Sequence, residues 1–597
     1  MWAVLAVPFV IAAAALHGRQ WNPVLDMAMT ELRVRDVGGG HTPLIGLPGR
    51  INVEESLLNQ GSHPGPLSFY LLAPTYRVLG SSAWGLLIGT VLLALVAIGL
   101  ALWLAQRRGG APLVLALGGL VAVVVRGYGM DVLTQPWNPY LPLLFWLVVL
   151  LATWSVLMGD RMMLVVAVAA GSLCAQTHMP YLALSLGTGA LGVAAVIVHW
   201  VRHPTGRDAA ARALGMSAVV GVVLWSPPVA DALGSGPWNL ATLVDYFRNP
   251  PEEPVGAVEG FRLALRHLDV FRLIGGAFGA DGYVTRAGFR LDGSIVPGLV
   301  VLAVWVLAVV LAWQQRHRLL LGLHAVIGWA FVLGAVSMGR IFGKVWYYLT
   351  LWAWTTTTLM VASIVWTAVV VIRQRVPHHA RTVRLVGAGV GALVAVSSWT
   401  VLVVEAVGTR APEQHLSDTL DAIAGRTAQA LGDGMGEATS EGGRYLVTWN
   451  DAANFGSQGF GLLNELERRG FDVGVLETWR VPATRHRVIA VEDATAEVRL
   501  ATGAYIEQVR LLPGAIEAVV YDPRDADDLA EYQQLEALVR AELEAVGLAE
   551  LLPLLDTNLF GLQLNSAVSP EVQDQVDRML HLGTTTAVFV LPPGSPL

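Results

Sequence analysis

Long apolar stretches recur from the start of the chain to residue 406 and then stop. Most are about 20 residues long, the length that an α-helix needs to cross a hydrocarbon layer about 30 Å thick. Arginine-containing polar segments separate them. The pattern predicts a multi-pass α-helical membrane protein with about eleven transmembrane helices. The expected spans are residues 2–16, 82–105, 112–125, 140–158, 162–177, 181–200, 213–230, 295–313, 319–338, 351–372 and 385–406.

Beyond residue 407 the pattern changes to short apolar runs separated by polar, helix-forming segments. Such alternation is typical of an α/β domain. The expected strands are residues 445–449, 473–476, 518–521 and 586–591. We therefore predict two domains, a transmembrane domain over residues 1–406 and a soluble α/β domain over residues 407–597.

Composition and charge support this division. The chain is 54% hydrophobic and 14% charged, against about a quarter charged in ordinary soluble proteins. Residues 407–597 contain 29 acidic and 13 basic side chains, a net charge of −16, whereas the remaining residues carry +9. The opposite net charges of the two parts support a domain boundary near residue 407.

Arginines identify alternate loops as cytoplasmic by the positive-inside rule. They stand at positions 107, 108, 161, 202, 207, 212, 316, 318, 373, 375, 381 and 384. The external segments are then the long loops 17–81 and 231–294, three shorter ones and everything after residue 407. We expect a protein of the cytoplasmic membrane with an extracytoplasmic C-terminal domain.

The ends and the cysteine content add little. The first apolar run lacks a basic n-region, so no cleavable signal peptide is expected. At about 16 residues this run is short for a span, which leaves open whether Met1 is the true start. Cys174 is the only cysteine, so an intramolecular disulfide is excluded.

Three acids lie in the first external loop, Asp26, Glu31 and Asp36. A carboxylate held at a membrane boundary can act as a general base if partial burial raises its pKa. Asp26 is the preferred candidate because it lies nearest the predicted bilayer, and Glu31 is a supporting acid. An ordinary solvated acidic loop is the alternative.

Other polar residues stand at the ends of predicted spans. Arg126 and Asp131 lie in RGYGMDVLTQPWNPYLP, and could contact a phosphate and a hydroxyl or simply pair with each other. His63 could bind substrate or cap the helix that follows it. His178 lies at the external end of a span, where a histidine is a candidate for function or a satisfied interfacial residue.

The segment GRIFGKVWYYLTLW supplies Arg340, Lys344 and Tyr347. Cations flanked by aromatic residues suit the phosphate of a membrane lipid, although anchoring at the interface is an equal alternative. A glycine cluster at 456, 459 and 461 has the spacing G-x-x-G-x-G rather than that of a dinucleotide site. With no Walker sequence, cysteine cluster or histidine metal pair, we expect no nucleotide-driven reaction, no nucleic-acid partner and no certain cofactor; a divalent metal is allowed but not required.

Read together, these segments resemble the GT-C class of membrane glycosyltransferases, in particular the actinobacterial arabinosyl- and mannosyltransferase-like branch and RgtA-type domains. The resemblance covers most of residues 17–240. It is carried by the early external Asp26 and by the segments HPGPLSFYLLAPTYRVLG, WNPYLP, QTHMPY and WSPPVADALGSGPWNL. Two features depart from the pattern: Met27 stands where many members have a second acid, and PWNL replaces a Gly-Asn-Leu segment.

The resemblance implies transfer of a sugar from a polyprenyl-phosphate donor to an envelope glycan, lipid or protein. Asp26 would deprotonate the acceptor hydroxyl, while Arg126, Arg340 or Lys344 would stabilise the departing phosphate. His63 and His178 would orient sugar hydroxyls or the phosphate. The alternatives are a transporter or flippase of a lipid-linked glycan and a non-catalytic envelope scaffold. Spans almost free of charge argue against transport.

Overall fold

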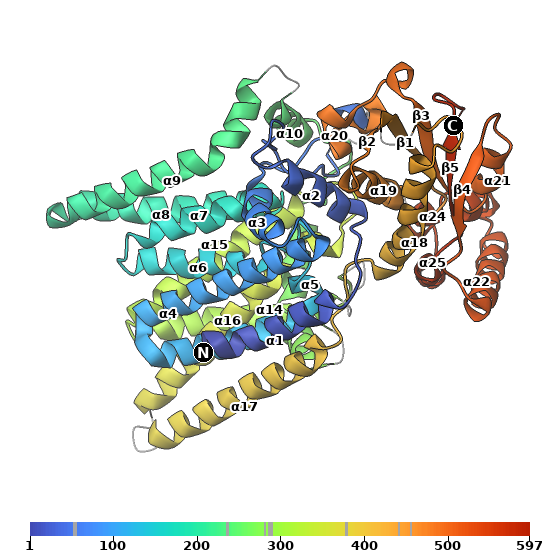
Figure 1. Ribbon diagram of the computed structural model, residues 1–597. Helices are drawn as coiled ribbons and strands as arrows, with labels where there is room; N and C mark the ends of the chain where they lie inside the picture. Colours follow the sequence, from blue (N-terminus) through green and yellow to red (C-terminus); the bar gives the residue numbers. More distant parts are fainter. Residues whose placement is uncertain are drawn as a thin grey trace. The chain divides into compact units, whose positions relative to one another are not determined.

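The computed structural model describes residues 1–51, 57–234, 238–279, 282–284, 291–375, 380–439, 442–453 and 456–596. The chain forms two compact units (Figure 1). Unit 1 consists of Met1–Gly18, Thr42–Glu54 and Gly61–Arg410. Unit 2 consists of Arg19–His41, Glu55–Gln60 and Ala411–Leu597. The segment 19–41, predicted as part of a loop of the transmembrane domain, therefore belongs to the unit that contains the C-terminal residues.

Unit 1 is a helical bundle. Seven of its described helices are long and apolar enough to cross a membrane, and three more apolar helices are shorter. The bundle helices are α1 (Trp2–His17), α4 (Ala83–Tyr128), α6 (Leu143–Leu157), α7 (Met163–Thr177), α8 (Tyr181–Arg202), α9 (Arg207–Leu233), α14 (Val296–Gln314), α15 (Arg318–Gly339), α16 (Ala353–Arg375) and α17 (Ala380–Ala406). In α4, Gly110 has a non-helical backbone two residues before Pro112, so this helix comprises the two predicted spans 82–105 and 112–125. Every predicted span is a helix, and the multi-pass helical fold is confirmed.

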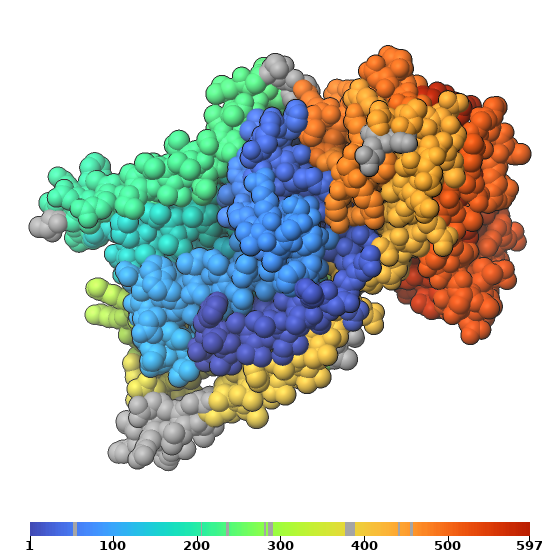
Figure 2. All heavy atoms as spheres, viewed as in Figure 1, coloured from blue at the N-terminus to red at the C-terminus, as the bar shows by residue number. Residues whose placement is uncertain are grey.

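Several bundle helices keep apolar faces uncovered, as a lipid-facing surface requires. In α9, Val222 is 72% exposed and Val219 is 64% exposed. Figure 2 shows α9, in green, at the edge of unit 1 with much of its surface uncovered. Shorter helices connect the bundle helices, and three of them are amphipathic. These connecting helices are α3 (Leu67–Val78), α5 (Met130–Leu133), α10 (Asn239–Arg248), α11 (Ala257–His267) and α12 (Val270–Phe278).

Unit 2 is an α/β unit around one five-stranded sheet of order β2-β1-β3-β5-β4. The strands are β1 (Arg444–Asn450), β2 (Asp472–Gly474), β3 (Ala496–Thr502), β4 (Ile516–Tyr521) and β5 (Thr586–Leu591). β1 pairs in parallel with β2 and β3, whereas β5 is antiparallel to β3 and β4. The main helices are α2 (Leu25–Asp36), α18 (Gln414–Gly432), α19 (Ser457–Arg468), α20 (Arg480–Ala483), α21 (Tyr505–Arg510), α22 (Ala526–Ala545), α23 (Pro553–Thr557), α24 (Leu559–Leu564) and α25 (Pro570–Leu582).

The four predicted strands correspond to β1, β2, β4 and β5, but the central strand β3 was not predicted. Its sequence, AEVRLAT, contains Glu497 and Arg499, and every residue of the strand is buried. The two side chains form an ion pair 2.5 Å long with each other, and the Thr448 hydroxyl donates to Glu497 at 2.5 Å. Because charged residues interrupt its apolar pattern, this strand does not look like a buried strand in the sequence.

Candidate functional site

The first candidate, Asp26, lies in the first turn of α2 and is partly buried. The preceding residue, Leu25, has a φ of +50°, a left-handed conformation that is rare for a bulky side chain. The Thr30 hydroxyl donates to the Asp26 carbonyl at 2.7 Å. The charge of Asp26 also acts on the buried guanidinium of Arg33. Asp26 therefore starts a helix at a strained backbone position, next to a buried cation.

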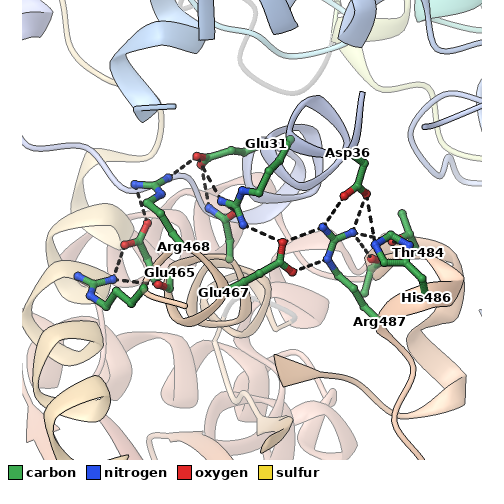
Figure 3. Close-up of polar contacts among 12 residues, drawn as sticks. Glu31, Asp36, Glu465, Glu467, Arg468, Thr484, His486 and Arg487 are labelled. Atoms are coloured by element: carbon green, nitrogen blue, oxygen red, sulfur yellow. Dashed lines mark hydrogen bonds and ion pairs between the residues drawn. The ribbon is translucent and has the colours of Figure 1, made fainter. Parts of the chain in front are cut away.

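The two other acids of this helix are built into ion pairs (Figure 3). Glu31 has a fully buried side chain that is paired with Arg468, and the Asn464 amide donates to it at 2.8 Å. Asp36 receives two hydrogen bonds of 2.8 Å from Arg487. We name as the α2 network the residues Glu31, Arg35, Asp36, Asn464, Glu467, Arg468 and Arg487. Glu31, predicted as a supporting acid, thus makes contacts typical of an anchoring residue.

Three members of the α2 network, Asp36, Glu467 and Arg487, have pKa values that favour their charged forms. Burial raises the pKa of Asp36, but hydrogen bonds from His486 and Arg487 outweigh it and hold the pKa below its usual value. Glu467 shows the same balance, with Arg487 and Arg35 lowering its pKa. Arg487 has a raised pKa because it contacts both acids. Asp36, Glu467 and Arg487 are therefore charged at neutral pH, and each contacts a group of opposite charge.

In unit 1, two histidines lie together. The His63 ring centroid is 5.3 Å from that of His178, and His63 Nδ1 accepts a hydrogen bond from the Met179 N–H at 3.1 Å. Burial lowers the pKa of His63 to about 4. Burial and the neighbouring His63 hold the pKa of His178 well below its usual value. Both rings are therefore neutral at physiological pH, and we refer to them as the histidine pair.

The backbone around the histidine pair is fixed by residues of other elements. The Asn239 amide oxygen accepts from the Ser62 N–H at 2.8 Å, and its amide nitrogen donates to the Ser62 carbonyl at 3.0 Å. This gives Asn239, whose role the sequence leaves open, a positioning function. Residues 235–237 of the WSPPVADALGSGPWNL segment lie outside the described residues.

Buried polar atoms without a partner gather next to the histidine pair. Within the described part of the chain they include Ser62 Oγ, Thr177 Oγ1, His178 Nδ1 and Tyr181 Oη. The His178 and Tyr181 ring centroids are 6.1 Å apart. A buried polar group without a hydrogen bond costs about 1–3 kcal/mol. Their concentration around one histidine therefore marks a place where polar groups of a ligand would be stabilising.

Two cations lie over one indole ring in unit 1. Lys344 Nζ is 4.7 Å and Arg50 Cζ is 5.6 Å from the Trp346 ring centroid. The Glu252 carboxylate oxygen Oε2 is 3.9 Å from the Arg50 guanidinium nitrogen Nη2. We name Arg50, Glu252, Lys344 and Trp346 the Trp346 cluster. Arg50 is 47% exposed and Glu252 38% exposed, so this cluster combines two cations with one acid at a surface that a ligand can reach.

The backbone beneath the Trp346 cluster is a short pair of antiparallel segments. The Val255 N–H donates to the Ile341 carbonyl at 2.9 Å, and the Gly256 N–H donates to the Gly339 carbonyl at 3.0 Å. Gly343 has a φ of +64°, and the Glu252 carboxylate occupies the space where its side chain would be. A glycine is therefore required directly before Lys344.

Aromatic rings connect the Trp346 cluster with the histidine pair. Tyr348 lies between them, with its ring centroid 6.1 Å from Trp346 and 6.2 Å from His178. Trp137 contacts Tyr348 with ring centroids 5.0 Å apart. A line of aromatic rings thus leads from two cations to two neutral imidazoles. Sites for small organic ligands commonly combine an apolar, aromatic lining with a few polar groups.

The other predicted residues have different surroundings. Arg340 lies over Phe342 and donates to the Phe247 carbonyl at 3.0 Å. Arg126 is 2% exposed and forms a 2.9 Å ion pair with Glu405. The Asp131 carboxylate accepts from the Arg410 N–H at 2.9 Å, and the Tyr347 hydroxyl accepts from Trp354 Nε1. Each of these three residues therefore has a partner within unit 1. Arg126 and Asp131 contact residues at or just after the end of α17, and Tyr347 contacts a buried tryptophan.

The sequence analysis did not identify Arg50 or Glu252. It also did not identify Trp346 as the ring over which two cations lie. Arg50 was detectable in principle, because it follows the apolar, turn-rich run TPLIGLPG without another charge. Glu252 was not, since its partner is distant in sequence. Among the described residues, no group of three or more histidine, cysteine, aspartate or glutamate side chains could hold a metal ion.

The glycine cluster of unit 2 has a packing explanation. Side chains at Gly456 and Gly459 would collide with the Trp449 ring, and one at Gly461 would collide with Leu420. These glycines let α19 approach its neighbours closely. Their spacing follows from packing and does not require a phosphate.

No family model matches the sequence, and no curated protein matches it. Among solved structures the chain is similar to two crystal structures of ArnT from Cupriavidus metallidurans, one bound to undecaprenyl phosphate and one in the apo state. The identities are 12% and 13%. Each match covers 87% of this chain and 95% of that chain, with a TM-score of 0.49. Similarity at this level carries no inference about fold or chemistry.

Proposed function

We propose that this protein is a membrane glycosyltransferase of the GT-C class, which transfers a sugar from a polyprenyl-phosphate donor to an envelope glycan, lipid or protein. The observation that carries the proposal is the arrangement of the Trp346 cluster and the histidine pair along one line of aromatic rings. A sugar phosphate combines the same two parts, an anion and an uncharged polyhydroxyl ring. The sequence resemblance to GT-C enzymes is an independent argument for the same reaction.

The Trp346 cluster suits the phosphate. Charge-assisted hydrogen bonds from guanidinium and ammonium groups are about twice as strong as neutral ones. Arg50 and Lys344 both lie within 6 Å of the Trp346 ring centroid, so a phosphate bound beside this ring would have two cations in its neighbourhood. Glu252 supplies a counter-charge to Arg50 that a phosphate would replace. Arg340 is a further cation for the same group, held by Phe342 and the Phe247 carbonyl.

The histidine pair suits the sugar rather than the phosphate. Two imidazoles that are neutral at physiological pH add no positive charge for an anion. They offer hydrogen-bonding nitrogens to hydroxyl groups. The unpartnered hydroxyls of Ser62, Thr177 and Tyr181 are of the same uncharged kind. This supports sugar hydroxyls rather than the phosphate as the groups that His63 and His178 orient.

The reaction we propose is a single displacement with inversion. Asp26 takes the proton from the acceptor hydroxyl as its oxygen attacks the anomeric carbon. The bond from this carbon to the phosphate oxygen breaks, and polyprenyl phosphate leaves with the electron pair. Lys344, Arg50 and Arg340 stabilise the charge that develops on the phosphate. The segment that carries Asp26 continues directly into unit 1 at Gly18 and at Thr42.

Location follows from the positive-inside rule. With the arginine-rich loops in the cytoplasm, the histidine pair, the Trp346 cluster and unit 2 are extracytoplasmic. The donor is then used at the outer face of the cytoplasmic membrane, where membrane lipids surround the bundle. Arabinose and mannose are the sugars that the family resemblance suggests first.

The test is transfer of radiolabelled sugar from polyprenyl-phosphate donors to an envelope extract, with arabinose, mannose, glucose and galactose donors in parallel. We expect Asp26→Asn to lower the rate by a factor of about 10² to 10⁴, the usual contribution of a general base. Asp527→Asn makes the same change in the first turn of α22, at an exposed position, and should leave the rate unchanged. Transfer that survives Asp26→Asn would favour a scaffold. A wild-type protein that is inactive with all four donors would favour a transporter or a scaffold.

A further inference from the structure

We infer that unit 2 is the positioning device of the proposed catalytic base: residues 411–597 hold α2 from both ends and thereby orient Asp26. The inference rests on the proposed function, and it assigns Glu31, Arg33 and Asp36 as positioning residues. It also gives the C-terminal part of the chain a role in the reaction itself.

The segment before α2 is bound by α18 and by Pro412, two residues before that helix. Trp21 Nε1 donates to the Pro412 carbonyl at 2.8 Å, and the Asn22 N–H donates to the Ser417 hydroxyl at 2.8 Å. The Asn22 amide also reaches Asp421 at 3.1 Å. These bonds are made within five residues of Asp26 and before the helix begins, so they fix the point at which the chain enters α2.

The body of α2 is bound by α19, α20 and the segment that contains Arg487. Glu31 pairs with Arg468 and accepts from Asn464. Arg33 donates to the Val481 and Pro482 carbonyls, each at 2.8 Å. At the end of the helix, Arg487 bridges Asp36 and Glu467, which also pairs with Arg35 (Figure 3).

Burial makes these contacts specific. Glu31 has no exposed side-chain surface, and Arg487 is 4% exposed. An ion buried without its partner costs several kcal/mol. Positions of α2 that separate these pairs are therefore strongly disfavoured, and the helix has one register against residues 411–597.

Asp26 lies on a different side of the helix from the main anchor. At 100° per residue, Asp26 and Glu31 point about 140° apart. Burial follows this difference, since Glu31 is fully buried and Asp26 only partly. Glu31 therefore anchors α2 from a different side, whereas Arg33, seven residues after Asp26, anchors it on nearly the same side.

The backbone next to Asp26 indicates that its orientation is imposed. Leu25 has a φ of +50°, a left-handed backbone conformation that is strained for a residue with a bulky side chain. Such strain persists only where surrounding contacts fix the chain. Here the contacts of Trp21 and Asn22 lie on one side of Leu25, and the α2 network lies on the other. The strain is located directly before the residue that the reaction needs.

The experiment compares Arg487→Gln with Arg510→Gln in the full-length protein. Arg487 bridges two acids at α2, and Arg510 bridges Glu507 and Glu517 at the surface of the same unit. Two quantities are measured, amide hydrogen exchange of residues 25–36 and the kcat and donor KM of sugar transfer. For Arg487→Gln we expect exchange at least about 10-fold faster and a kcat lowered by up to about 100-fold, the effect of a misplacement near 1 Å. The donor KM should stay within about 3-fold, because donor contacts lie in unit 1.

Two further variants keep the result decisive. Asp36→Asn removes one charge with little change of shape and replaces Arg487→Gln if that protein does not fold. Arg487→Lys keeps the charge and should restore part of kcat. Faster exchange with an unchanged kcat would overturn the positioning role. If wild-type protein transfers no sugar, the proposed function fails, whereas the exchange data still decide whether unit 2 holds α2.

Discussion

The charges around α2 in unit 2 and the charges of the Trp346 cluster in unit 1 are held in opposite ways. In the α2 network, Glu31 and Arg487 are buried and each contacts more than one charged or amide group. In the Trp346 cluster, Arg50 is 47% exposed, lies on an aromatic ring and has an acid 3.9 Å away. One arrangement satisfies its charges internally, and the other leaves Arg50 and Glu252 partly exposed to solvent.

Charged residues can either fix the fold or bind a ligand, and the sequence alone does not distinguish these two roles. The difference in burial between the two groups does. A buried, fully paired ion fixes one arrangement of the chain. A half-exposed cation on an aromatic face loses little when it stays unliganded, and it gains a charge-assisted bond when an anion binds. We therefore expect substitutions in the α2 network to affect stability, and substitutions in the Trp346 cluster to affect donor binding.

Glu31→Gln should produce the largest effect. It removes the buried charge that pairs with Arg468, and breaking such a pair costs about 3–5 kcal/mol. The free energy of opening of the β1 and β3 amides, measured by hydrogen exchange, should fall by that amount. The control is Glu517→Gln, which breaks an exposed pair with Arg510 and should cost about 0–1 kcal/mol. Equal effects of the two variants would contradict the comparison.

Arg50→Ala and Lys344→Ala should weaken donor binding and leave the stability of unit 2 unchanged. A hydrogen bond to a charged group contributes about 1.5–3 kcal/mol, so each variant should raise the dissociation constant for polyprenyl phosphate by a factor of about 10 to 100. Calorimetric titration of the purified protein measures this constant. Arg107→Ala, an exposed arginine over Trp103 at the cytoplasmic side by our orientation, is the matched control.

Gly459→Ala tests whether the glycine cluster is only a packing feature. The added methyl group would collide with Trp449, and overpacking costs about 1–3 kcal/mol. Gly425→Ala, in α18 with open space around it, should instead stabilise unit 2 by about 0.5–1 kcal/mol. Melting of the full-length protein shows both shifts. Sugar transfer should continue in both variants below their melting temperatures, and a specific loss in Gly459→Ala would point to a ligand there.

Lowering the pH should weaken the α2 network gradually, with a smaller loss of stability than the substitutions above cause. Hydrogen bonds hold the folded-state pKa values of Asp36 and Glu467 below the usual values of these side chains, about 4, despite the opposing effect of burial. The unfolded state then binds more protons, so this stability is present above about pH 4 and is lost as the pH falls towards the folded-state values. The melting temperature should decline between pH 5 and 3, and Asp36→Asn with Glu467→Gln should flatten the decline.

The sequence predicted the transmembrane helices well because lipid imposes a simple rule on every span. Each apolar run of about 20 residues became a helix, and even the division of α4 followed from Gly110 and Pro112. The strand β3 escaped prediction because Glu497 and Arg499 satisfy each other inside the sheet. Apolar patterning detects burial of apolar side chains, and it misses a buried strand whose charges are paired.

The candidate site was predictable in its residue types and not in its grouping. His63, His178 and Lys344 were identified from aromatic and polar residues at span ends, and the structure brings the two histidines together. Arg126 looked equivalent to Lys344, but its pairing with Glu405 depends on helix packing that spacing cannot show. Glu31 and Asp36 looked like loop acids, because their partners lie more than 400 residues later.

The long sequence separation between α2 and its partners has a consequence for the synthesis of the protein. Asp36 and Arg487 are 451 positions apart, and ribosomes add about 5–20 residues per second. During synthesis α2 therefore exists for roughly half a minute to a minute and a half before the arginine that holds its end is made. An interrupted chain inserts its early helices and keeps Asp26, yet it lacks the partners of Glu31 and Asp36. Only a chain translated past Arg487 contains both partners of this ion pair, so the α2 network cannot be complete before that point of synthesis.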